Sequence, residues 1–400
     1  DPCLPELTAQ KPDFFISHRW PPRTQAPEAG AWISIIPWEF GAIPQLWVER
    51  INQAEMHGVW VPSAYVAHSF WRSGVIPEKL TVIPNGVDTR QFCPEGPLYP
   101  LQTQKSFCFL FVGGALHRKG LDILLKAYTA VFSAHDDVCL VIKVFGGDSH
   151  YAVQSILPKA SSNAPEIEYI TQDLLPEEMA ALYRRCQVYV HPYRGEGFAL
   201  PILEAMASGT PVMIPDAGPA PEFCSEAAGW YLPTRICSDG AMNIANQGVA
   251  PVHAYFTTVD DSVLAAQMQA VQRTQDWKAK GRQAAKEALA YDWERLYPRL
   301  KQSLQAMGPR HKPNPSAGVP SRLYLDNPWE LLPLYNTPEL QFVNDRVLAE
   351  QSLFYCLNPG DIKFLQESSQ ALSEGFAICA TESLRHALVE GGWPLEQSCV

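Results

Sequence analysis

The stretch "QVYVHPYRGEGFALPILEAMASGTPVMIP", residues 187–215, contains one strand–helix–strand repeat. The apolar residues at its two ends predict buried strands over 187–193 and 211–215. Between them, the apolar residues of 199–208 predict a helix. Two strands joined through a helix indicate a parallel βαβ unit.

The same alternation continues on both sides of this stretch. Upstream, the continuous apolar run "FCFLFVGG" (107–114) ends in two glycines, as a buried parallel strand does before a turn. Further strands are predicted at 138–147 and 166–171, and helices after Lys119 and at 176–186, 261–273, 276–289 and 292–307. Strands that alternate with helices predict an α/β fold with a doubly wound parallel sheet.

Composition and charge limit the function classes. Four hundred residues suffice for two or three domains, and 46% hydrophobic with 18% charged residues is typical of globular proteins. A net charge of −11 disfavours non-specific binding to nucleic acid or to an anionic membrane. The longest uncharged apolar run, 107–116, is far shorter than the roughly 20 residues of a membrane-spanning helix.

The chain start and the cysteines bear on location. The chain begins "DPCLPELTAQKPD", without a basic leader or an apolar stretch, so we expect no secretory signal. The missing initiating Met is consistent with a fragment or a processed product. Ten cysteines occur singly, without a CxxC pair or zinc-ligand spacing, which favours a reducing, cytoplasmic location.

The loop "GGALHRKG" (113–120) lies between a predicted strand and a predicted helix. Gly113 and Gly114 let the backbone approach an anion, and the helix N-terminus carries a partial positive charge. Arg118 and Lys119 add two cations at the same place, where a diphosphate would bind. The same pattern also fits an ordinary tight turn with two exposed bases.

Two glutamates flank the start of the predicted helix 199–208. Glu196 follows the carboxyl end of a predicted parallel strand, where open α/β sheets bind ligands. Glu204 lies eight residues further on, about two helical turns if the segment is fully helical. Retaining glycoside hydrolases need carboxyl groups about 5 Å apart, so a hydrolase fits this spacing poorly. We therefore predict that the two carboxylates hold different parts of an extended ligand, although Glu204 alone also fits a solvated helix position.

The segment "RGEGFALPILEAMASGTPV" (194–212) resembles the signature of retaining glycosyltransferase family 4, also called glycosyl transferases group 1. That signature has two glutamates separated by seven residues and then Ala-Met-Ala-x-Gly-x-Pro-Val. Three other segments resemble further motifs of the family in the same order, and the resemblance covers roughly residues 58 to 307. They are "VIPNGVDTRQF" (82–92), "FVGGALHRKGLDILLKAY" (111–128) and "QDLLPEEMAALYRRCQVYVHP" (172–192).

The resemblance implies a GT-B fold, with two Rossmann-like domains facing across a cleft. It implies a nucleotide-diphosphate sugar donor, of UDP or GDP type, and transfer with retained configuration to a sugar, glycan or lipid-linked acceptor. No cofactor or metal is expected, because metal-dependent transferases of the other major fold use a DxD tripeptide that this sequence lacks.

The site residues follow from the same resemblance. Glu196 would hold the donor sugar, Glu204 the ribose and Lys119 the diphosphate. The family usually has Arg where this chain has Gly114, so either Arg118 substitutes for it or the diphosphate site is weakened. The predicted donor-binding residues are Gly113, Gly114, Arg118, Lys119, Glu196, Gly197, Phe198, Ala199, Leu200 and Glu204.

The expected N-terminal half is short for a complete Rossmann-like domain, and no Gly-rich acceptor loop is visible in it. His18 and Glu39 both follow predicted strands there, in the half where the family often carries a His near the reaction centre. We name them as candidate catalytic residues beside Glu196 and Lys119; a structural role for each is the alternative. The expected parts are a partial acceptor-side domain (1–105), a donor-binding domain (106–290), a crossover helix (291–308), a Pro-rich linker (309–322) and an extension of unknown role (323–400).

Other functions remain open from the sequence. The short first half and Gly114 also fit a catalytically degenerate module that binds nucleotide sugars, or a fragment of a larger multidomain glycosyltransferase. Sugar phosphorylases and nucleotide-sugar epimerases share the two-domain architecture, but we identify no cofactor lysine, and an epimerase does not need this pair of glutamates. A nicotinamide-dependent oxidoreductase is disfavoured because GxGxxG is absent.

Overall fold

A computed structural model describes residues 14–18, 22, 25–27, 30–144, 162–237, 255–274 and 276–307. The chain divides into two compact units, and each is described by itself. Unit 2 holds Pro84–Cys237 and Phe256–Pro298. Unit 1 holds the described residues before Pro84, together with Tyr255 and the described residues after Pro298. The predicted linker (309–322) and extension (323–400) lie outside the described residues.

Unit 2 is built on a six-stranded sheet in which every neighbouring pair is parallel. Its spatial order is β10-β9-β8-β5-β6-β7, so the chain builds outward from β5 in one direction and from β8 in the other. The point at which the direction reverses lies between β5 and β8, where ligands bind in sheets of this kind. The strands are β5 (Phe107–Val112), β6 (Val138–Lys143), β7 (Glu166–Ile170), β8 (Val188–Val190), β9 (Val212–Pro215) and β10 (Gly229–Leu232).

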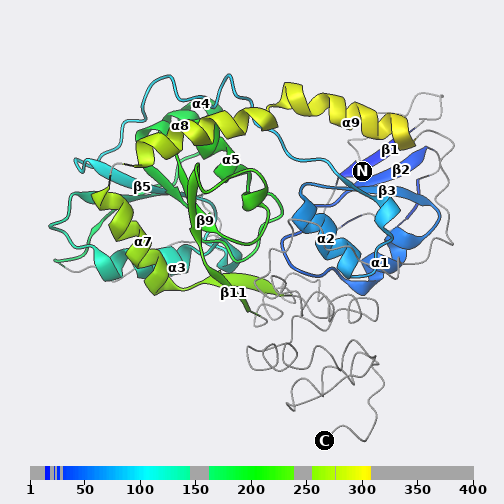
Figure 1. Cartoon of the computed structure of the whole chain (residues 1–400), viewed down its shortest axis with the longest axis horizontal. Coiled ribbons are helices and arrows are strands. Elements are labelled where there is room, and N and C mark those ends of the chain that lie inside the picture. Colours follow the sequence, from blue (N-terminus) through cyan, green and yellow to red (C-terminus); the bar gives the residue numbers. More distant parts are fainter. Residues whose placement is uncertain are drawn as a thin grey trace, which may run out of the picture. The chain divides into compact units, whose positions relative to one another are not determined.

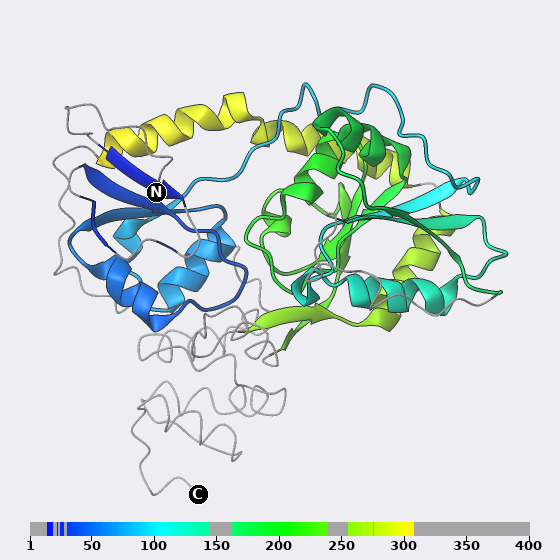
Figure 2. The same ribbon diagram turned by 180° about the vertical axis from the view of Figure 1, so that it is seen from behind.

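Helices cover both faces of this sheet, as the views in Figures 1 and 2 show. On one face lie α4 (Pro176–Arg185), α5 (Leu200–Ala207) and α8 (Trp277–Ala288), and on the other α3 (Leu121–Val131) and α7 (Asp261–Arg273). Strand β5 explains the division, because its alternate residues pack into two separate hydrophobic clusters, Cys108 and Leu110 in one and Phe109 and Phe111 in the other. The predicted doubly wound α/β fold is confirmed.

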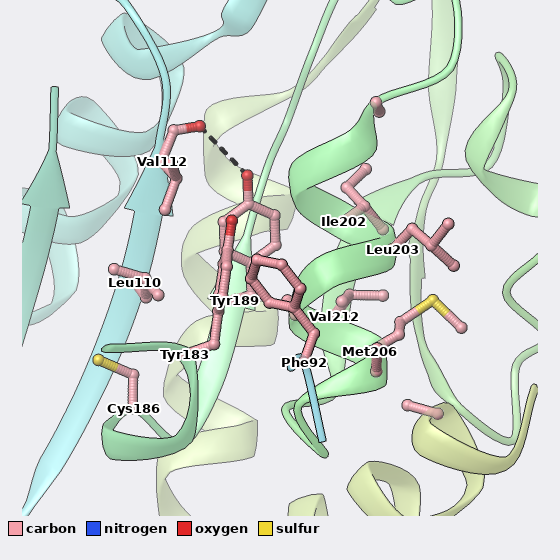
Figure 3. Close-up of a cluster of buried hydrophobic side chains, with 14 of the residues drawn as sticks. Phe92, Leu110, Val112, Tyr183, Cys186, Tyr189, Ile202, Leu203, Met206 and Val212 are labelled. Atoms are coloured by element: carbon pink, nitrogen blue, oxygen red, sulfur yellow. Dashed lines mark hydrogen bonds between the residues drawn. The ribbon is translucent and has the colours of Figure 1, made fainter. Parts of the chain in front are cut away.

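The core beneath α5 joins several elements that are distant in sequence (Figure 3). Tyr183 from α4 and Tyr189 from β8 pack together with Phe92, and Ile202 and Met206 extend the cluster from α5. All five side chains are buried. This packing sets the position of the first turn of α5, which follows the loop that carries Glu196.

Residues 84–105 belong to unit 2, so the boundary lies before them and not after residue 105 as predicted. Val87 and Phe92 are buried in its core, and the side chain of Asp292 accepts hydrogen bonds from the amide and hydroxyl of Thr89. This segment has no helical or strand periodicity, so its membership depends on tertiary packing. The segment 82–92, one of those that resemble motifs of the family, spans the observed boundary between Ile83 and Pro84.

Unit 1 contains a four-stranded parallel sheet in the order β1-β2-β3-β4. The strands are β1 (Phe14–His18), β2 (Ala31–Ile35), β3 (Met56–Val61) and β4 (Leu80–Val82), with helices α1 (Gln45–Asn52) and α2 (Ala64–Arg72). Strands β2 and β3 are almost entirely buried. The two strands predicted beside His18 and Glu39 are therefore present as β1 and β2.

A pair of short strands and a last helix lie outside these two sheets. A short antiparallel pair joins β11 (Thr234–Cys237) to β12 (Phe256–Val259), and the last helix is α9 (Trp293–Met307). Among the helices that the structure describes, none combines the length and the apolar character needed to cross a bilayer.

Helix α8 packs closely onto the turn that follows α5. A Cβ at Gly281 of α8 would overlap the carbonyl oxygen of Gly209, which has a left-handed φ of +79°. Alanine usually stabilises a helix relative to glycine, but here overpacking opposes that gain. We expect Gly281→Ala to lower the free energy of unfolding by about 2 kcal/mol, measured by urea denaturation. Arg282→Ala, at the exposed neighbouring position, is the control, and equal stability of the two variants would contradict the close packing.

Candidate functional site

The candidate site lies at the carboxyl ends of β5 and β8, where two loops meet. The loop after β5 contains a short 3-10 helix, His117–Lys119, and then Gly120, whose φ is +73°. A Cβ on Gly120 would overlap the carbonyl oxygen of Pro192 in the loop after β8. Glycine is therefore required here both for its backbone conformation and for the close approach of the two loops.

Glu196 is the centre of a cluster of charged and polar side chains. Although only 5% of the residue is exposed, its Oε1 atom pairs with Nζ of Lys119 and lies 3.3 Å from Nε2 of His191. Its other oxygen, Oε2, lies 3.4 Å from a guanidinium nitrogen of Arg118. Burial acts to raise the pKa of Glu196, but Lys119 and Arg118 outweigh it and hold that pKa well below its usual range. Glu196 is therefore a buried anion at neutral pH.

The start of α5 adds backbone amides beside this anion. Ala199 has a left-handed φ of 67° and is the only non-glycine residue with positive φ in the part of the chain that the structure describes. The helix begins at Leu200 without a side-chain cap, so no capping side chain accepts hydrogen bonds from the backbone amides of its first turn. Strain of this kind is common at binding sites. Phe198, in contrast, packs its ring into the core against Phe223, so its side chain is structural.

Glu204 lies on α5 and has a different environment from Glu196. Its Oε2 atom accepts a hydrogen bond of 2.9 Å from the hydroxyl group of the buried Tyr183. Burial raises the pKa of Glu204 to about 7, although the Tyr183 bond acts in the opposite direction. Because α5 begins only at Leu200, the segment between the two glutamates is not fully helical, and the two-turn estimate does not apply to it.

An ion pair and several hydrogen bonds that the sequence did not reveal connect the two loops. The guanidinium group of Arg194 forms a bidentate pair with Asp122, with N···O distances of 2.8 and 2.7 Å, and donates at 2.6 Å to the His117 carbonyl. The amides of Arg194 and Gly195 both donate to the carbonyl oxygen of Arg118. These bonds place the cations of one loop against the carboxylate of the other. Arg194 and Asp122 are far apart in sequence, and no local pattern marks them as partners.

The predicted site residues thus fall into two groups. Unit 2 brings together Lys119, Arg118 and Glu196, with His191 as a further member. The other predicted catalytic residues lie in unit 1, where His18 is the exposed last residue of β1 and Glu39 follows β2. Their catalytic roles stay predictions. In the ranges that the structure describes, no three His, Cys, Asp or Glu side chains gather in a way that could hold a metal ion.

Comparison with known proteins identifies the class. Residues 106–245 match the family Glycosyl transferases group 1, and this range contains the loop after β5, Glu196 and Glu204. The chain resembles solved glycosyltransferase structures with the GT-B fold, which agrees with its two α/β units and their parallel sheets. This part of the chain therefore matches the group 1 glycosyltransferase family, and the chain has a GT-B type fold.

Individual relatives give the range of similarity. The MMP alpha-(1->4)-mannosyltransferase of Mycolicibacterium hassiacum is 32% identical over 164 residues, which are 40% of this chain and 37% of that protein. The GDP-mannose-dependent alpha-mannosyltransferase of Mycolicibacterium smegmatis is 39% identical over 108 residues, 27% of this chain and 25% of the relative. The structure of Anabaena Alr3699/HepE in complex with UDP-glucose matches this chain with a TM-score of 0.52 at 16% identity. The match covers 69% of this chain and 72% of the Anabaena chain. The chain thus spans well under half the length of these two curated relatives.

The raised pKa of Glu204 predicts a pH-dependent stability. An ordinary Glu, with a pKa of 4.5, ionises in the unfolded chain at lower pH than the folded Glu204 does. The folded state therefore keeps the proton of Glu204 up to a higher pH than the unfolded chain does. The free energy of unfolding falls as pH rises from 4.5 to about 7. Glu204→Gln should remove about 2 kcal/mol of this fall, as seen in urea denaturation across that pH range.

The matched control is Glu177→Gln, on the exposed start of α4. Its pH dependence should follow that of the wild type. An unchanged slope in Glu204→Gln would show that Glu204 does not hold a proton in the folded state at these pH values.

Proposed function

We propose that this protein is a glycosyltransferase that moves a sugar from a nucleotide-diphosphate sugar to a sugar, glycan or lipid-linked acceptor with retained configuration. The observation that carries the proposal is the buried, ionised Glu196, which two cations surround at the strand-order reversal of a group 1 domain. A site with both signs of charge suits a donor that has an anionic diphosphate and a hydroxyl-rich sugar.

The chemistry follows from where charge develops. When the bond between the anomeric carbon and the diphosphate oxygen breaks, negative charge grows on the leaving diphosphate. Lys119 and Arg118 are positioned to stabilise that charge, and the amides at the start of α5 add to their effect. Both cations pair with Glu196, so a diphosphate would compete with this carboxylate for them. Once the cations turn to the diphosphate, Glu196 can accept hydrogen bonds from sugar hydroxyls.

Glu204 is proposed to accept hydrogen bonds from the ribose, with Tyr183 holding its Oε2 atom. His18 and Glu39 are proposed to act on the acceptor side. The donor is proposed to be of UDP or GDP type, since one relative is named for GDP-mannose and one structural neighbour is a complex with UDP-glucose. We propose no metal or other cofactor, because the sequence lacks the DxD tripeptide. The cytoplasmic location stays a prediction.

A second candidate is a degenerate module that binds nucleotide sugars without turnover. Two observations favour it. The family's usual arginine is Gly114 in this chain, and Glu196 pairs with both nearby cations, Arg118 and Lys119. Nucleotide binding without sugar transfer to any acceptor class would support this candidate.

Substitution of Lys119 and Glu196 tests the site. Lys119→Ala should lower kcat by about 100-fold to 1,000-fold, as loss of one group that stabilises the transition state commonly does. Glu196→Ala should abolish turnover, because it removes the proposed sugar-binding carboxylate and the negative charge that faces Lys119 and Arg118. Thermal-shift titration with UDP, GDP and their sugar conjugates identifies the donor, and product analysis then measures transfer.

The control is Lys126→Ala on α3, which removes a surface pair with Asp261 and should leave donor binding and turnover unchanged. Full activity in both site variants, with the fold intact, would refute the assignment of the site.

A further inference from the structure

His191 is a buried imidazole at the edge of the charged cluster around Glu196. It follows β8 directly, has an exposed fraction of 0%, and packs its ring against the ring of Phe111. Its Nδ1 atom lies 2.6 Å from the hydroxyl oxygen of Tyr189, and its Nε2 atom lies 3.3 Å from Oε1 of Glu196. In the described elements that pack against the ring, the titratable or charged groups that face it are Tyr189, Tyr193, Glu196, Arg118 and Lys119.

Tyr189 determines which ring nitrogen of His191 carries the hydrogen. Its hydroxyl group donates its one proton to the Val112 carbonyl at 3.2 Å, the bond drawn in Figure 3, and therefore accepts from Nδ1. Burial lowers the pKa of His191, so the imidazole is neutral at pH 7 and has a single N–H. With that hydrogen on Nδ1, Nε2 has a lone pair, for which the described residues supply no aligned hydrogen-bond partner.

The net charge of the cluster would change sign when a nucleotide-sugar donor binds. Glu196 contributes one negative charge, and Lys119 and Arg118 contribute two positive charges, so the three side chains together carry +1. A donor diphosphate adds one negative charge on each phosphate, which would change the sum to −1. Unbalanced charge is strongly unfavourable in a buried site, and one added proton would bring the sum to zero.

Nε2 of His191 is well placed to take up this proton. It has an available lone pair beside the carboxylate, and the ordinary pKa of a histidine is 6.5, compared with 4.5 for a glutamate. Glu196 acts to raise the pKa of His191, whereas Lys119 and Arg118 act to lower it. Movement of the two cations toward a diphosphate would therefore raise the pKa of this imidazole, and the negative charge of the diphosphate would add to the rise.

We propose that His191 binds a proton at Nε2 when a donor diphosphate draws the two cations away from Glu196. The proton comes from the buffer and forms an N–H bond at Nε2, while the Nδ1–H still donates to Tyr189. The imidazolium replaces the positive charge that the carboxylate loses, so Glu196 stays ionised and can accept hydrogen bonds from the sugar. This role deepens the proposed function and rests on it. Donor binding is thereby linked to pH, and the affinity falls as pH rises.

Calorimetry of donor binding counts the proton. The full chain is titrated with UDP-glucose and with GDP-mannose in buffers that differ in ionisation enthalpy; neither probe has a phosphate group that titrates near neutral pH. Glu204, with a pKa of about 7, would also exchange a proton, so the titrations compare Glu204→Gln with the double variant Glu204→Gln/His191→Gln.

We expect Glu204→Gln to take up about half a proton or more per bound donor at pH 7, and its donor Kd to rise by up to about tenfold per pH unit above that. In the double variant we expect no uptake and a Kd that does not change with pH. Equal proton uptake in the two variants would overturn the proposal.

Nitrogen NMR follows the same proton in the otherwise unchanged protein. The full chain is labelled with ¹⁵N-histidine, and the signals of His191 are assigned by their loss in His191→Gln. At pH 7 we expect hydrogen on Nδ1 alone before the probe is added and on both ring nitrogens at saturation. Hydrogen on Nε2 before addition, or a neutral ring with the probe bound, would overturn the proposal. The exposed His135, between α3 and β6, is the internal control, and its signals should not change.

The outcomes separate this inference from the proposed function. If the chain binds neither probe and transfers no sugar, the proposed function fails and the proton uptake fails with it. If the chain binds a probe and transfers its sugar while His191 stays neutral, this inference fails and the proposed function stands.

Discussion

The ionised carboxylate of Glu196, buried between Lys119 and Arg118, is the constraint on which the rest of unit 2 depends. A buried anion is strongly unfavourable unless cations and hydrogen-bond donors surround it. Its cations come from a loop about 77 positions earlier in the chain, so the two loops must meet in every folded molecule. The adjacency of β5 and β8 meets this requirement, because the carboxyl ends of neighbouring parallel strands open onto the same edge.

Several features support this contact without taking part in it. The Arg194–Asp122 pair ties the two loops, and Gly120 allows their backbones to approach. Beneath them, α5 is held by a core that Tyr183 and Tyr189 share. The site is therefore preorganised by packing and by hydrogen bonds between elements, which lowers the reorganisation needed when a ligand with complementary charge binds.

The two glutamates of one short segment have opposite electrostatic environments. Cations lower the pKa of Glu196, whereas Glu204 accepts a hydrogen bond from the Tyr183 hydroxyl group and burial raises its pKa to about 7. Glu196 is thus an anion at neutral pH, whereas Glu204 titrates near neutral pH. This difference fits two separate tasks on one extended ligand better than a shared acid–base reaction on one bond.

The sequence by itself determined the elements and the chemistry of the loops. Apolar runs and helical spacing predicted the strands of the donor-side sheet and its helices, because burial on both faces leaves a continuous apolar pattern. Glu196 was predicted because it follows a predicted strand, and Arg118 and Lys119 because they precede a predicted helix; the family resemblance supplied their expected roles. Only the tertiary structure decided the partners: Arg194 with Asp122, Tyr183 with Glu204, Tyr189 with His191, and residues 84–105 with unit 2. The physical reason is that most of these contacts join residues far apart in sequence, which no local sequence pattern relates to one another.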